Sequence, residues 1–101
     1  MLLFFYGEMT LPAIGLQSIE LVSDCALAYG ELKEIDGRST LVPDPSYREV
    51  VPGELYQLSA VSIQEQERVL SRLDESFGTV FHRHTLELYQ PRVTAQAYLL
   101  G

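Results

Sequence analysis

The clearest pattern of apolar and polar positions lies between residues 62 and 78. Apolar side chains recur there at spacings of seven, three and four, which places them on one face of a helix; they are Ile63, Leu70, Leu73 and Phe77. Ser62 and Glu65 have the spacing of a capping box, and Gly78 suits a helix C-terminus. The pattern therefore predicts one helix that begins after Ser62 and ends before Gly78.

Most other apolar segments are typical of strands. Gly53 predicts a bulge or a close approach to the backbone, and the Gln90-Pro91-Arg92 segment predicts a hairpin between the last two strands. The first segment is uncharged, which indicates a strand buried on both faces. The segments cover residues 2–6, 25–32, 39–42, 50–58, 80–89 and 93–100.

Two regions have no clear period. Residues 13–23 fit neither a helix nor a strand, and we expect a short helix or an irregular crossing there. Residues 33–50 contain the turn residues Asp36-Gly37 and Pro43-Asp44-Pro45-Ser46. We expect this second region to be a mobile loop in which only residues 39–42 form a short strand.

The predicted fold class is α+β. Strands outnumber helices, and most connections are too short for repeated strand-helix-strand crossovers, so a small, curved, antiparallel or mixed sheet should pack against the helix. A sheet that curls in this way leaves a pocket at its mouth.

Composition narrows the function classes. The chain has 101 residues, enough for one domain over 1–101, and its net charge of −7 disfavours nucleic acids and anionic membranes as partners. The single cysteine, Cys25, is expected to be a small buried residue. The apolar opening is too short for a signal sequence, so we expect a cytoplasmic protein. An exposed strand edge can pair with a second copy, so we expect either a monomer or a weak homodimer.

Six short segments, taken in order and at their spacings, point to a known family. They are Tyr6-Gly7 after the first strand, Gly30-x-Leu32, Val51-Pro52-Gly53-Glu54-Leu55-Tyr56, Leu73-Asp74 before Gly78, Phe81-x-Arg83 and Ala95-x-x-Tyr98. Together they resemble the gamma-glutamylcyclotransferase-like family over nearly the whole chain. The resemblance implies a small β-barrel with a flanking helix and a cavity near Tyr6-Gly7.

The resemblance also implies a reaction. The α-amine of a γ-glutamyl group attacks its own γ-carbonyl and releases 5-oxoproline, which needs no cofactor but does need a carboxylate to move the amine proton. In the family this carboxylate lies in a Leu-Asp-x-x-Glu-Gly pattern, and the corresponding position here is Phe77. A phenyl ring cannot accept a proton.

Three carboxylates are candidates to replace the missing base: Glu75, Glu8 and Glu54. The expected substrate-binding residues are Tyr6, Gly7, Glu8, Met9, Tyr98 and Arg83. The loop after Tyr6 can turn backbone N–H groups toward an oxyanion, although Glu8-Met9 stands where the family has Thr-Leu and a carboxylate there repels an anionic substrate. Arg83 can instead form a structural pair with Asp74 or Glu75.

Metal chemistry has little support in the sequence. His82 and His84 face the same way in a predicted strand, but no third ligand follows at a recognisable spacing, so we interpret them as exposed strand residues.

Two hypotheses about the function remain. The chain is either a cyclotransferase acting on a γ-glutamyl amine or peptide with a relocated base, or a ligand-binding or protein-interaction module on the same scaffold.

Overall fold

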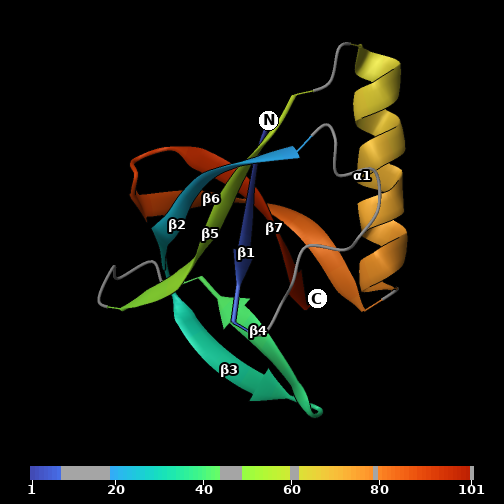
Figure 1. The fold of residues 1–101 in the computed structure, drawn as a ribbon. Coiled ribbons are helices and arrows are strands. Elements are labelled where there is room, and N and C mark those ends of the chain that lie inside the picture. The colour runs from blue at the N-terminus through green and yellow to red at the C-terminus, as the bar shows by residue number, and fades with distance from the viewer. Residues whose placement is uncertain (8–18, 44–48, 60–61, 79, 101) are drawn as a thin grey trace.

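A computed structural model describes residues 1–7, 19–43, 49–59, 62–78 and 80–100 of the chain. Within them lie one helix and seven strands, so the α+β fold class is confirmed (Figure 1). The strands are β1 (Leu2–Tyr6), β2 (Ile19–Tyr29), β3 (Glu31–Ile35), β4 (Arg38–Val42), β5 (Val50–Leu58), β6 (Phe81–Gln90) and β7 (Thr94–Leu100), and the helix is α1 (Ile63–Phe77). The helix is not long enough to cross a membrane.

Five strands pair in the order β1-β5-β2-β6-β7. All of these neighbours are antiparallel, and a parallel bridge between Leu3 and Gln96 then joins β1 to β7, so the order of strands returns to its start. The expected mixed sheet is therefore present. In Figure 1, α1 stands beside this sheet and the β3–β4 hairpin lies below it.

The core has two parts because β1 is buried on both faces, as its uncharged sequence predicts. Phe4 and Tyr6 point to one side, into a cluster formed with inward side chains of the other strands. Leu3 and Phe5 point to the other side, where they meet Leu73 and its neighbours on α1. The first strand thus joins the interior of the sheet to the layer beneath the helix.

The helix begins and ends where its sequence predicts. Ser62 accepts a hydrogen bond from the backbone N–H of Glu65 at 3.1 Å, and Gly78 is the C-cap. Leu70 and Leu73 are buried, but Ile63 is 76% exposed, so its predicted place in the buried stripe is wrong. Periodicity identifies the apolar face of a helix, but only the folded structure shows how much of that face the sheet covers.

The β3–β4 hairpin replaces most of the predicted mobile loop. Asp36 and Gly37 have φ values of 52° and 78°, and positive φ at both central residues defines the two-residue turn that matches strand twist. The hairpin is held to the sheet by buried Leu41 and by Thr40, whose Oγ1 accepts a hydrogen bond from Leu100 N at 3.0 Å. The expectation for residues 44–48 lies outside the described residues.

The second strand also differs from its prediction. It already begins at Ile19, so the irregular crossing expected there is wrong, while residues 13–18 lie outside the described residues. It ends at Tyr29, so Gly30 divides the single strand predicted over residues 25–32 between β2 and β3. Cys25 is exposed, not buried. Register shifts between Leu21 and Ala26 interrupt the alternation of inward and outward side chains, which explains why the pattern was unreadable.

Gly53 is a place of close backbone approach, as predicted. A Cβ atom there would lie 2.4 Å from the carbonyl oxygen of Phe5 and 2.6 Å from the ring of Phe4. Only a residue without a side chain allows β1 and β5 to pair at this point, where Tyr6 lies opposite Gly53.

Candidate functional site

A cavity of about 320 Å³ lies at the end of β1, where the resemblance places a ligand site. Tyr6 and Gly7 supply one wall, and the end of α1 and the start of β6 supply Phe77 and Phe81. The tip of the β3–β4 hairpin adds Gly37, Arg38 and Ser39 to the part of the lining that the described residues form. Its size is at the lower end of the range for small-molecule sites.

Phe77 is the central aromatic side chain of this cavity. Its ring stacks on Tyr98 with the centroids 4.3 Å apart and the planes at 22°. The ring centroids of Phe5 and Phe81 lie 6.1 Å and 6.3 Å from that of Phe77. Phe77 is therefore a hydrocarbon side chain that is packed against three other aromatic rings.

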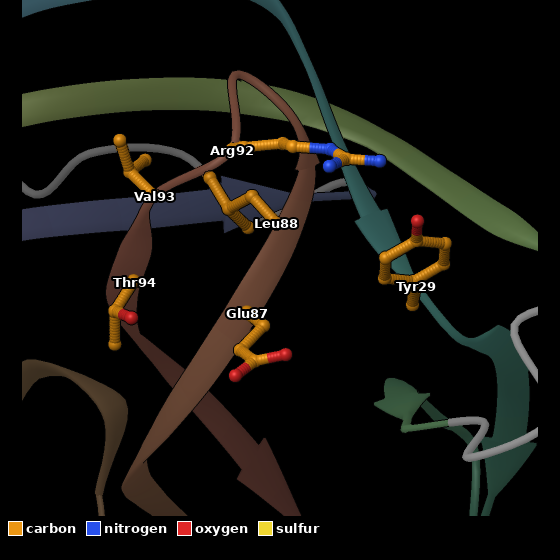
Figure 2. Close-up of a pocket in the computed structure, with 6 residues that line it drawn as sticks. All are labelled: Tyr29, Glu87, Leu88, Arg92, Val93 and Thr94. Carbon is orange, nitrogen blue, oxygen red and sulfur yellow. The ribbon is translucent and has the colours of Figure 1, made fainter.

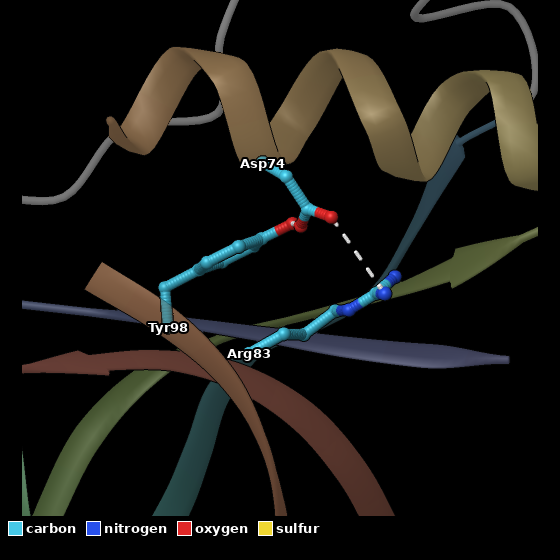
Figure 3. Close-up of polar contacts among 3 residues, drawn as sticks. All are labelled: Asp74, Arg83 and Tyr98. Atoms are coloured by element: carbon cyan, nitrogen blue, oxygen red, sulfur yellow. Dashed lines mark hydrogen bonds and ion pairs between the residues drawn. The ribbon is translucent and has the colours of Figure 1, made fainter. Parts of the chain in front are cut away.

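Tyr6 and Tyr98 belong to a polar chain behind the cavity. The Tyr6 hydroxyl donates a hydrogen bond to the carbonyl oxygen of Tyr98 at 2.6 Å, and the Tyr98 hydroxyl donates to Asp74 Oδ1 at 2.6 Å. Asp74 Oδ2 lies 3.7 Å from Arg83 Nη2 (Figure 3). Arg83 thus lies beside Asp74, one of the two placements expected for it, and both tyrosine hydroxyls already have acceptors.

The environment of Tyr98 strongly favours its protonated form. Burial raises the pKa of the Tyr98 hydroxyl above its usual range, and the hydrogen bond to Asp74 and the negative charge of Asp74 raise it further. The positive charge of Arg83 acts in the opposite direction. Tyr98 therefore remains a hydrogen-bond donor near neutral pH and holds α1 against β7.

The candidate bases lie in different places. Glu75 is exposed on α1 and does not line the cavity. Glu54 is exposed on β5. Burial of Tyr56 raises the pKa of its hydroxyl, and the negative charge of Glu54 and a hydrogen bond with Glu54 raise it further. Glu8 and Met9 lie outside the described residues. Among the described residues, the cavity lining contains one cation, Arg38, and no carboxylate.

A second opening of about 320 Å³ adjoins this region and is lined by Asp74, Gly78, Phe81, His82 and Arg83. His82 and His84 are exposed on β6, as predicted. In the part of the chain that the structure describes, no group of three or more His, Cys, Asp or Glu residues is placed to hold a metal ion.

Sequence reasoning brought Tyr6, Gly7 and Phe77 to one cavity but missed Arg38 and Ser39. The available signal was Asp36-Gly37 between two segments of strand-forming residues, which is a strong local indication of a hairpin.

Comparisons of the chain with protein-family models, with curated proteins and with solved structures find no match.

Proposed function

We propose that this chain is a gamma-glutamylcyclotransferase-like protein whose cavity binds a small carboxylate-bearing molecule without converting it. One observation carries the proposal: Phe77, at the position of the family's glutamate, lines the cavity and stacks on Tyr98 at 4.3 Å. The packed ring leaves no proton acceptor where the resemblance requires one.

The other lining residues support the choice of ligand. Arg38 is a planar cation whose N–H groups match a carboxylate, and no described carboxylate in the lining opposes it. Phe77 and Phe81 offer ring faces and edges to an apolar group. A compact molecule with one carboxylate and an apolar portion complements both features.

A second candidate is turnover with Glu8 as the base, because Gly7, the residue before it, lines the cavity. In that reaction the substrate's α-amine nitrogen bonds to its γ-carbonyl carbon, and the bond from that carbon to the leaving amine breaks. Glu8 takes the proton from the attacking nitrogen and returns it to the leaving amine. The products are 5-oxoproline and a free amine or amino acid.

The deciding experiment measures 5-oxoproline release from γ-glutamyl dipeptides and γ-glutamylamines by the wild type and by Glu8→Gln and Glu75→Gln. We expect no release by any of the three proteins. Release by the wild type that is lost in one variant would refute the proposed binding role and would identify the base.

Binding is tested separately by amide NMR titration with γ-glutamyl dipeptides and with phenylacetate. We expect saturable shifts at Gly7, Arg38 and Ser39, and weaker binding by Arg38→Gln. Arg68→Gln, a change of the same type on the exposed face of α1, is the matched control. An absence of shifts at the cavity with every probe would contradict the proposal.

A further inference from the structure

A separate cavity of about 340 Å³ lies at the turn between β6 and β7. The described residues that line it are Tyr29, Glu87, Leu88, Arg92, Val93 and Thr94, and none of them lines the cavity at Tyr6 and Phe77 (Figure 2). In Figure 1 the β6–β7 turn lies on the side of the molecule away from α1. This cavity is therefore distinct from the candidate site described above.

The framework of this cavity is held by backbone and core contacts. Leu88 N donates to the carbonyl oxygen of Val93 at 2.9 Å, and Val93 N donates to that of Pro91 at 2.9 Å. Leu88 is 3% exposed and belongs to the core cluster inside the sheet. The Tyr29 ring contacts that of Tyr89 edge-on, with the centroids 5.3 Å apart. The apolar part of the lining is thus fixed in place.

Two opposite charges stand on this framework. Figure 2 shows Arg92 extending from the turn toward Tyr29, and the carboxylate of Glu87 lower on β6, on the side that faces Tyr29. Glu87 lies opposite Thr94 in the β6–β7 ladder. Neither Glu87 nor Arg92 forms an ion pair with a residue in the described ranges. Both charges are available to a ligand.

We propose that this cavity binds the zwitterionic head of a free apolar α-amino acid. Arg92 receives the α-carboxylate, because a guanidinium matches a carboxylate with two parallel hydrogen bonds. Glu87 receives the α-ammonium, and Val93 and the Tyr29 ring contact the apolar side chain. A ligand with only one of the two charges leaves either Glu87 or Arg92 without a counter-charge.

The test is an amide NMR titration of the intact protein with L-leucine, N-acetyl-L-leucine and L-leucinamide. The acetyl compound lacks the ammonium and the amide lacks the carboxylate, so each removes one charge. We expect saturable shifts at Leu88, Val93 and Thr94 with L-leucine, and binding weaker by at least about tenfold with the other two compounds. Equal binding of the three compounds, or no saturable shift with L-leucine, would overturn the proposal.

Two variants test whether Arg92 and Glu87 bind the charged groups of the ligand. Arg92→Gln and Glu87→Gln should each weaken L-leucine binding by at least about tenfold. Both residues are exposed, so we expect the variants to keep the dispersed spectrum of the folded wild type. Arg68→Gln and Glu67→Gln on the exposed face of α1 are the matched controls, and Arg38→Gln tests the other cavity. Unchanged affinity in Arg92→Gln or Glu87→Gln, or an equal loss in Arg38→Gln, would refute the assignment.

Discussion

Replacing Phe77 with alanine tests the packing on which the proposed function depends. The side chain is half-buried, stacks on Tyr98 at 4.3 Å and has Phe5 and Phe81 as further ring neighbours. Full burial of a phenylalanine stabilises by about 1.5–3 kcal/mol, of which roughly half applies here. Aromatic pairing adds about 0.5–1.5 kcal/mol. We therefore expect Phe77→Ala to lower the free energy of unfolding by about 1–3 kcal/mol.

Urea unfolding followed by circular dichroism measures this loss. With a slope of about 2 kcal/mol per molar urea, the midpoint should fall by about 0.5–1.5 M. The matched control is Ile63→Ala, which changes another member of the predicted apolar stripe that the structure leaves 76% exposed. Its expected loss is below about 0.5 kcal/mol.

A double-mutant cycle isolates the stacked pair. Phe77→Leu and Tyr98→Leu, alone and together, should give a coupling energy of about 0.5–1.5 kcal/mol, because each single change removes the same ring contact. Equal losses in Phe77→Ala and Ile63→Ala, or a coupling energy near zero, would refute the reasoning that Phe77 is a structural ring at this position.

Two further changes test the core. The native state holds the Tyr98 proton more tightly than the unfolded chain does, so the stabilisation from Tyr98 is complete below about pH 10 and falls above it. Between urea unfolding at about pH 8 and at about pH 11, the free energy of unfolding should therefore fall less in Tyr98→Phe than in the wild type, by about 1.4 kcal/mol per pH unit above pH 10. Equal falls in the two proteins would argue against this. Gly53→Ala should lower the free energy of unfolding by about 3 kcal/mol, because the added Cβ atom clashes with the carbonyl oxygen of Phe5. The control is Gly37→Asn, which lies in open space at a positive φ and should cost less than about 1 kcal/mol. Similar losses in the two variants would contradict the clash.

The sequence by itself determined those elements of the fold that depend on only a few neighbouring residues. The Ser62 cap and the C-terminal Gly78 lie within one helix and are correct to the residue, and the apolar period of α1 is correct for Leu70 and Leu73. The uncharged β1 is also correct to the residue, and the hairpin joining β6 to β7 is confirmed, with each of its strands beginning one residue later than predicted. The Asp36-Gly37 turn was equally local, although its flanking strands are exposed along much of their length and lack a clear apolar alternation.

Tertiary structure decided what depends on segments far apart in the chain. Local period could not show that the sheet leaves Ile63 in solvent, or that bulges in β2 leave Cys25 exposed. The candidate site is of this kind, since the hairpin that carries Arg38 meets Phe77 only in the folded protein. The sequence alone shows a phenylalanine at position 77, where the proposed resemblance would have a glutamate. The fold decided that this ring packs on Tyr98, because burying aromatic surface favours a partner ring over water.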